Sequence, residues 1–184
     1  MKRLSLIGTL AVCALASTAS AQTDQEIIDR SVAAAPGNAR AAAMVVKWNT
    51  DGTRVVVRPG TNGMVCWDQS AWPHQQPFSA HCTSVANLPR VEQNREFFLK
   101  ASSAPEAEKL VQAAEKDGSR KVPEYGAAWM GLVGKDQASA RAHITIAVPF
   151  ATTETSKLPS KPVASSAWIM NAGTSAAHIM VPGH

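Results

Sequence analysis

The most informative absences in this sequence are long apolar runs, charge clusters and diagnostic catalytic motifs. Beyond its first residues the chain has no apolar stretch of the ~20 residues that a membrane-spanning helix needs. Charged residues make up 17% of the chain and form no basic run, so nothing indicates nucleic-acid binding. The motifs G-x-S-x-G, H-E-x-x-H and H-x-H are absent, as are the glycine-rich loops that hold phosphates or dinucleotides. The sequence therefore names no catalytic activity.

The first residues have the layout of a cleavable secretory signal. Lys2 and Arg3 precede an apolar run, and small residues follow up to Ala21. At about twelve residues, the apolar run is too short to cross a membrane. This layout predicts that 1–21 is a signal peptide, cleaved before Gln22.

Cleavage of the signal also affects two properties of the mature chain, its attachment to lipid and its net charge. Cys13 approximates a lipidation site, but Val12 precedes it where such sites have a small side chain. We therefore expect soluble export to the periplasm or the extracellular space. The signal takes two basic residues with it and so lowers the formal net charge of +4 by two, which again argues against nucleic acid as a partner. The mature segment, 22–184, has the size of one ordinary domain.

Two cysteines remain in the mature chain, Cys66 and Cys82. In an oxidising compartment such a pair predicts one disulfide. It would close a loop of about 15 residues and stabilise the fold by roughly 3 kcal/mol in the chain-entropy model. The alternative is a thiolate pair for metal binding or redox chemistry. The spacing fits neither a C-x-x-C motif nor a zinc knuckle, so we favour the disulfide.

Hydrophobic periodicity divides the mature chain into strands, then helices, then strands again. Strands are expected at 44–48, 54–58, 64–67, 125–133, 141–149, 168–170 and 178–181. Helices are expected at 23–35, 91–101 and 103–118, and loops at 68–89 and 151–164. Short turns join the first three strands as a meander, and the last two form a closing hairpin. We therefore predict a single α+β domain: an antiparallel β-sheet, with a meander and C-terminal hairpins, packed with two or three helices.

Phrases at both ends of the mature chain resemble an uncharacterised family of bacterial secreted proteins. The N-terminal phrases are EII at 26–28, AAAP at 33–36 and PGTNGMVC at 59–66. The C-terminal phrases are HITIAVP at 143–149, WIM at 168–170, GT at 173–174 and AHIMVP at 177–182. The resemblance covers most of the mature chain at its two ends and is weak in the helical middle. It implies export and a single fold, and it implies no chemistry.

Three residues of the C-terminal strands are candidate metal ligands: His143, His178 and Met180. His178 and Met180 share one face of an extended strand. His143 opposes the apolar residues Ile144 and Ile146, so its side chain should leave the core side of its strand. If the two strands pair, both imidazoles open onto one surface and could bind copper or zinc. The alternative is that each histidine is a hydrogen-bonded structural residue.

A second candidate site is the loop that the disulfide constrains. Its aromatic and imidazole side chains belong to Trp67, Trp72, His74 and His81. Such side chains could stack against a sugar ring or an apolar ligand. Alternatively, the tryptophans cover the open edge of the sheet, as large aromatic residues often do in small domains.

These observations favour one function and leave one alternative. The favoured function is a non-catalytic binding or interaction module, whose partner is a small molecule, a glycan or a protein. The alternative is a metal-assisted enzyme built around His143 and His178, with copper or zinc as cofactor. A Ser-His-acid triad is recognised by the arrangement of its three side chains in space and not by their spacing in the sequence. No motif in this sequence identifies residues that would form one.

Overall fold

The computed structural model describes residues 22–181, so the predicted signal peptide at 1–21 and its cleavage site lie outside the described part at its upstream end. The helices are α1 (Asp24–Ser31), α2 (Leu88–Lys100), α3 (Ala104–Asp117) and the short α4 (Thr153–Ser156). The strands are β1 (Met44–Trp48), β2 (Arg54–Arg58), β3 (Met64–Asp68), β4 (Phe78–Ser84), β5 (Ala128–Gly134), β6 (Arg141–Ala147), β7 (Trp168–Met170) and β8 (His178–Met180). None of these helices is long and apolar enough to cross a membrane.

All eight strands belong to one sheet, in the order β2-β1-β3-β4-β5-β6-β8-β7. Neighbouring strands are antiparallel except β1 and β3, which run parallel. The predicted α+β class and the mostly antiparallel sheet are confirmed. The predicted meander of the first three strands is wrong, because β3 pairs with β1 and not with β2.

The segment between β2 and β3 crosses the beginning of β1 instead of forming a hairpin turn. The backbone N–H of Thr61 donates a 2.8 Å hydrogen bond to the carbonyl of Ala42. A Cβ on Gly60 would lie 2.1 Å from the backbone nitrogen of Met44. Glycine is therefore needed where the two backbones touch. Pro59 and Gly60 form a pair that usually indicates a tight turn. Here Gly60 instead allows this segment to lie directly against β1.

Strand β4 lies in the 68–89 stretch, where the sequence predicts a loop. It occupies the middle of the sheet between β3 and β5. Phe78 and Ala80 face the core on the α1 side, while Ser79 and Thr83 are buried on the opposite face. The hydroxyl of Thr83 donates a 2.9 Å hydrogen bond to the carbonyl of Ala128, so this buried polar side chain has a partner.

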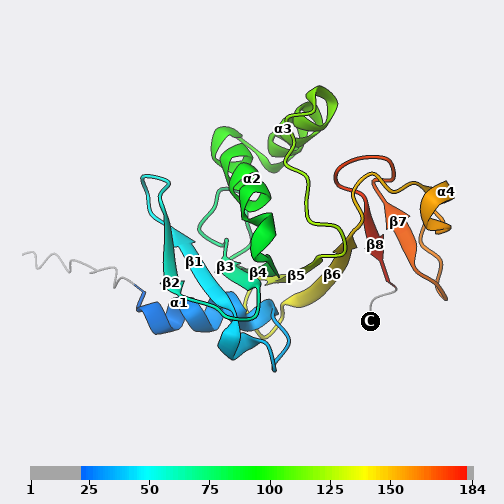
Figure 1. Ribbon diagram of the computed structural model, residues 1–184. Helices are drawn as coiled ribbons and strands as arrows, with labels where there is room; N and C mark the ends of the chain where they lie inside the picture. Colours follow the sequence, from blue (N-terminus) through cyan, green and yellow to red (C-terminus); the bar gives the residue numbers. More distant parts are fainter. Residues whose placement is uncertain (1–21, 182–184) are drawn as a thin grey trace, which may run out of the picture.

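Helices cover both faces of the sheet (Figure 1). On one face, α1 and the 3₁₀ turn Val32–Ala34 pack over a core cluster of Val32, Ala35, Ala43, Val45, Cys66, Cys82 and Met130. On the other face, α2 packs over a cluster of Val46, Val65, Trp67, Trp72, Leu88 and Val91. Helix α3 packs against α2 (Figure 1). The far end of the sheet, at β6, β8 and β7, extends beyond α2.

Cys66 and Cys82 are joined by a disulfide. The two residues are directly opposed on β3 and β4, and neither is exposed. The predicted disulfide is confirmed. It links two central strands inside the core on the α1 side.

The two faces of β6 are the reverse of the prediction. Ile144 and Ile146 are 51% and 40% exposed, because they lie on the α1 side of the sheet, while α1 packs on β2, β3 and β4 nearer the other end. His143 and Thr145 lie on the α2 side instead. The prediction that the isoleucines mark the core side is therefore wrong, and His143 lies on the same face of the sheet as α2.

Candidate functional site

A row of directly opposed residues crosses the face of the sheet that α2 covers. Trp67 of β3 opposes His81 of β4. His81 in turn opposes Gly131 of β5, which opposes His143 of β6. Directly opposed residues project from the same face of an antiparallel sheet. The register therefore places two imidazoles on this face, with a glycine between them.

Gly131 is the residue of this row that has no side chain. A Cβ at this position would lie 3.3 Å from both Cε1 and Nδ1 of His81, so the His81 ring leans over the glycine backbone. The absence of a side chain on Gly131 therefore leaves room for the His81 ring. Gly131 also lies among the residues that line the cavity on this face.

Strand β8 adds a third histidine. Ala147 lies on the same face of β6 as His143 and Thr145, and it is directly opposed to His178 of β8. His178 Nδ1 lies 2.7 Å from the carbonyl oxygen of Ala176. A carbonyl only accepts, so Nδ1 carries the hydrogen and Nε2 is the nitrogen left to meet a ligand.

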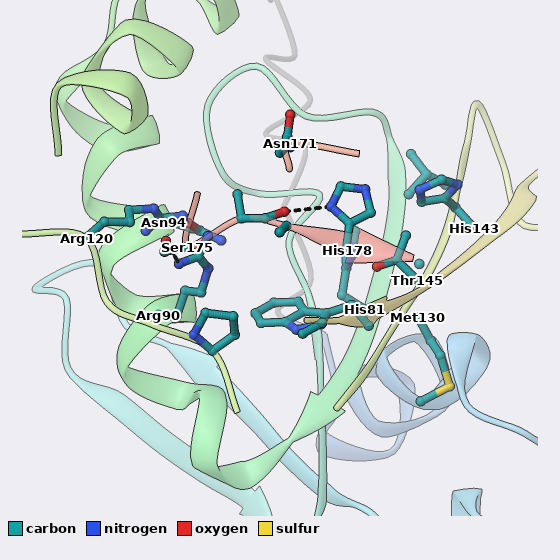
Figure 2. Close-up of a pocket in the computed structure, with 17 residues that line it drawn as sticks. His81, Arg90, Asn94, Arg120, Met130, His143, Thr145, Asn171, Ser175 and His178 are labelled. Atoms are coloured by element: carbon teal, nitrogen blue, oxygen red, sulfur yellow. Dashed lines mark hydrogen bonds between the residues drawn. The ribbon is translucent and has the colours of Figure 1, made fainter. Parts of the chain in front are cut away.

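The three histidines line one cavity of about 350 Å³ (Figure 2). Its walls come from α2, the segment that follows α3, strands β4, β5, β6 and β8, and the β7–β8 connection. Figure 2 shows Arg90 and Arg120 at one side of the cavity and His143 at the other. The lining residues, all within the described part of the chain, include no Asp or Glu.

The ionisable side chains that line the cavity differ in their charge at pH 7. Burial lowers the pKa of His81 to about 4, against the opposing effect of Asp68, so this imidazole is neutral at pH 7. Burial and the charge of Arg90 lower the pKa of Arg120 to about 10, which leaves the guanidinium protonated. Burial also lowers the pKa of Arg90. The arginine end of the cavity is therefore cationic.

The predicted metal site is only partly assembled. His143 and His178 share the cavity, whereas Met180 is opposed to Trp168 of β7 and is not a lining residue. Within residues 22–181 no group of three or more His, Cys, Asp or Glu side chains is placed to hold a metal ion. Zinc sites take at least three protein ligands, so the described residues fit such a site poorly.

The predicted aromatic loop is largely part of the core. Trp67 and Trp72 are 2% and 8% exposed. Trp72 makes an edge contact with Trp48 at 5.4 Å between ring centroids. His74 Nε2 lies 3.0 Å from the carbonyl oxygen of Ala101, just past the end of α2. Both indoles are therefore mostly enclosed, although Trp72 borders a separate hollow beside Trp48 and Arg95. Of the four predicted residues only His81 lines the histidine cavity.

Sequence reasoning missed the polar half of the cavity. Arg90 lies in the first turn of α2, directly after Pro89, and Arg120 lies two residues after Gly118, the C-cap of α3. An arginine near a helix end is usually a solvated residue, so the sequence held no signal that either side chain is buried.

The chain matches no family model, no curated protein and no solved structure.

Proposed function

We propose that the chain is an exported binding protein that holds a small molecule in the cavity between α2 and strands β5, β6 and β8. One observation carries the proposal: five cationic or imidazole side chains from distant parts of the sequence converge on one cavity, namely His81, Arg90, Arg120, His143 and His178. Its volume of about 350 Å³ lies within the ~300–1,000 Å³ range of small-molecule sites.

Export is supported by the layout of residues 1–21 and by the disulfide. A disulfide persists in the periplasm or outside the cell and is rare in the cytoplasm. The resemblance to bacterial secreted proteins points the same way. Intact-mass measurement of protein recovered from a bacterial periplasm tests this part. The expected mass is that of a chain beginning at Gln22, and a lipid-modified chain beginning at Cys13 would contradict it.

Binding is tested by titration of the mature protein with a panel of sugars, amino acids, carboxylic acids, nucleotides, zinc and copper. The readout is the NMR signal of each imidazole. We expect a panel member to shift the signals of His143 and His178 and to leave that of His74, which lies outside the cavity. If no member moves the cavity histidines, the proposal is wrong. A response to zinc or copper alone would favour the metal-assisted enzyme.

Variants separate a binding role from a structural one. His143→Ala should abolish binding and leave the melting temperature nearly unchanged, because the His143 side chain is exposed at the cavity. His178→Asn keeps a donor for the carbonyl of Ala176 and should also abolish binding. His74→Ala is the matched control and should bind normally. A large loss of stability in the first two variants, with normal affinity, would make both histidines structural.

A further inference from the structure

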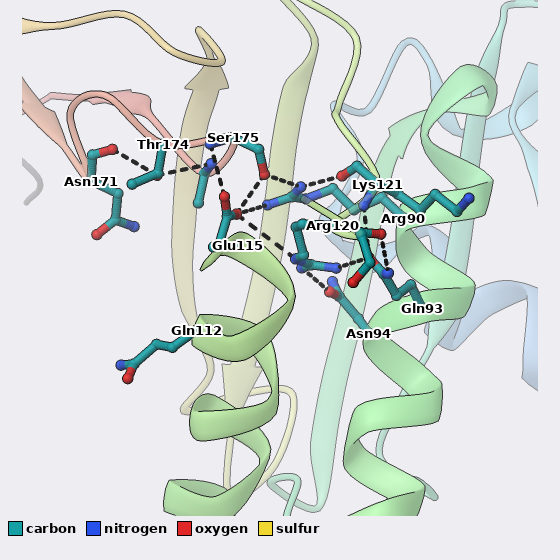
Figure 3. Close-up of polar contacts among 12 residues, drawn as sticks. Arg90, Gln93, Asn94, Gln112, Glu115, Arg120, Lys121, Asn171, Thr174 and Ser175 are labelled. Atoms are coloured by element: carbon teal, nitrogen blue, oxygen red, sulfur yellow. Dashed lines mark hydrogen bonds and ion pairs between the residues drawn. The ribbon is translucent and has the colours of Figure 1, made fainter. Parts of the chain in front are cut away.

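Two buried arginines share one carboxylate at the cationic end of the cavity (Figure 3). Arg90 Nη2 lies 3.8 Å and Arg120 Nε lies 4.0 Å from Glu115 Oε1. The side chains of Arg90 and Arg120 are 8% and 5% exposed, and that of Glu115 is 19% exposed. Glu115 also accepts hydrogen bonds from the backbone N–H of Ser175 at 3.1 Å and from its hydroxyl at 2.5 Å.

The charges of this cluster do not balance. Two buried guanidiniums form ion pairs with a single carboxylate, and part of that carboxylate's hydrogen-bonding capacity is taken by Ser175. A second carboxylate, that of Glu108, also favours the charged form of Arg120, but it is exposed and forms no ion pair with Arg120 within residues 22–181. A buried charge without a counter-charge is costly. The lowered pKa of Arg120, caused by burial and then by Arg90, has the same origin. An anion placed here would offset the remaining positive charge.

The remaining bonds of Arg120 go to neutral groups. Its Nη1 donates a 2.6 Å hydrogen bond to Gln93 Oε1, and its Nη2 donates to Asn94 Oδ1. Its Nε is buried and has no hydrogen-bond partner among residues 22–181. Buried donors without a partner are rare in native proteins. Arg120 therefore has one buried donor without a hydrogen-bond partner, and the residue also lines the cavity.

We propose that the cavity recognises its ligand through an oxyanion, a carboxylate or a phosphate group, bound by Arg90 and Arg120. This inference rests on the proposed function, and it names the class of ligand. A guanidinium group binds such an oxyanion in bidentate geometry, through two parallel N–H···O hydrogen bonds. The rest of the ligand extends past Gly131 toward His143 and His178, which also line the cavity.

A second hollow reaches the same arginines from the other side, between α2 and α3. It shares Arg90, Asn94 and Arg120 with the histidine cavity, but Glu108 and Glu115 also line it. These carboxylates would repel an anion at close range. The histidine cavity has no acidic lining residue, so the oxyanion is assigned to that side.

The cluster could instead serve only to hold α2, α3 and the β7–β8 connection together. Arg90 Nη1 donates to Ser175 Oγ at 2.9 Å and to the carbonyl of Lys121, which ties three segments to one side chain. A purely structural cluster, however, needs no anion and should not respond to one. The two interpretations therefore differ in a measurable way.

The test titrates the mature protein with inorganic phosphate and, separately, with acetate, at constant ionic strength held with chloride. The readout is the NMR signal of each arginine Nε–H. We expect at least one of the two anions to shift the signals of Arg90 and Arg120 saturably. Arg95 is an internal control, because its Nε is also buried and without a partner but its guanidinium lies over Trp48, outside this cavity. A non-saturable shift, or an equal shift at Arg95, would overturn the inference.

Arg120→Lys keeps the positive charge and removes the Nε–H and the fork. We expect it to bind the responding anion about tenfold more weakly, or ~1.4 kcal/mol. Should this variant not fold, Arg90→Lys serves the same purpose. Arg95→Lys is the matched control and should keep the wild-type affinity. Unchanged affinity in a folded Arg120→Lys protein would assign the arginine to structure alone.

The outcomes for the oxyanion and for the cavity are distinguishable. If a panel ligand shifts His143 and His178 while neither anion shifts the arginine signals, the cavity binds a ligand but the oxyanion inference fails. If the arginine signals respond while no panel member moves the histidines, the proposed function fails. A response to phosphate alone indicates a phosphorylated ligand, and one to acetate alone indicates a carboxylic acid.

Discussion

The imidazole of His81 stacks on the indole of Trp67, with ring centroids 5.7 Å apart and ring planes inclined by 21°. The two residues are directly opposed on β3 and β4, and the His81 Nε2 lies 3.0 Å from the Ser79 hydroxyl oxygen. Trp67 belongs to the core, while His81 faces the cavity. This stacked pair thus connects the core under α2 to the candidate site.

The first prediction concerns the stability of the fold between pH 7 and pH 5. Burial lowers the pKa of His81 from 6.5 to about 4, so the unfolded chain binds a proton at His81 that the folded protein does not. Stability must then fall as the pH drops from about 6.5 toward 4. We expect a loss on the order of 1–2 kcal/mol between pH 7 and pH 5 in urea unfolding.

His81→Phe is the matched variant, because phenylalanine can still stack on Trp67 but does not titrate. Its unfolding free energy should be flatter between pH 7 and pH 5 than that of the wild type. Hydrogen bonds from Thr23 and Ser102 also lower the pKa of Glu26 and of Glu106, but both carboxyls are present in the two proteins, so their contribution cancels when the slopes are compared. Equal slopes for the wild type and the variant would mean that His81 is not the titrating group.

The second prediction concerns Gly131. An added Cβ would stand 3.3 Å from two atoms of the His81 ring, which is tighter than ordinary van der Waals contact. We expect Gly131→Ala to displace the imidazole, to lower stability by roughly 1–2 kcal/mol in urea unfolding, and to weaken ligand binding. Gly37→Ala is the control, because a Cβ there meets nothing within 4 Å. Normal stability and binding in Gly131→Ala would contradict this prediction, because the His81 ring would then have moved aside without any loss of stability or affinity.

The third prediction concerns the disulfide. Cys66 and Cys82 join adjacent central strands and are fully buried. Reduction should lower the free energy of unfolding by roughly 3 kcal/mol, because the unfolded chain gains freedom once the bridge is open. Urea titrations with and without dithiothreitol measure this difference. Thiol counting in denatured, unreduced protein should find no reactive thiol, and two would mean that the bridge does not form.

Much of the fold follows from local patterns. Helix α3 is capped by Ser103, whose side chain accepts from the backbone N–H of Glu106, and it ends at Asp117 before Gly118, which has a left-handed conformation. These signals lie within a few residues of one another, so the sequence predicts this helix well. The C-terminal hairpin of β7 and β8 is likewise set by neighbouring residues.

Long-range pairing was not predictable in the same way. Strand β4 has small and polar residues on a face that other elements bury, such as Ser79, which is not exposed. It therefore lacks the apolar alternation that marks a strand. The parallel pairing of β1 and β3 depends on the close approach of Gly60 to Met44, and a Pro-Gly pair reads equally well as a turn.

The candidate site was predicted in part. The strands of His143 and His178 do pair, as β6 and β8, and both side chains reach one cavity. The reason given for the orientation of His143 was wrong, because exposed isoleucines occupy the other face. The burial of Arg90 and Arg120 depends on packing between α2, the segment after α3 and the β7–β8 connection, which no local pattern encodes.

The last prediction concerns Glu115, the carboxylate that two buried arginines share. Glu115→Gln keeps the shape of the side chain and removes its charge, which leaves Arg90 and Arg120 without a counter-charge. Removal of one partner from a buried ion pair typically costs about 3–5 kcal/mol, and the partial exposure of Glu115 places the expected loss near the lower end. The variant should therefore melt well below the wild type.

Phosphate should restore part of this loss, because an anion bound at the arginines replaces the missing charge and stabilises only the folded state. The rise in melting temperature on adding phosphate, relative to chloride at equal ionic strength, should be larger for Glu115→Gln than for the wild type. Glu96→Gln is the control: it removes one exposed negative charge from α2, where Glu96 forms a surface pair with Lys100 that contributes little to stability, and Glu96 lines neither of the two hollows at the arginines. It should melt like the wild type and respond to phosphate no more strongly. If phosphate raises the melting temperature of all three proteins equally, the anion acts on the whole protein surface and not at Arg90 and Arg120.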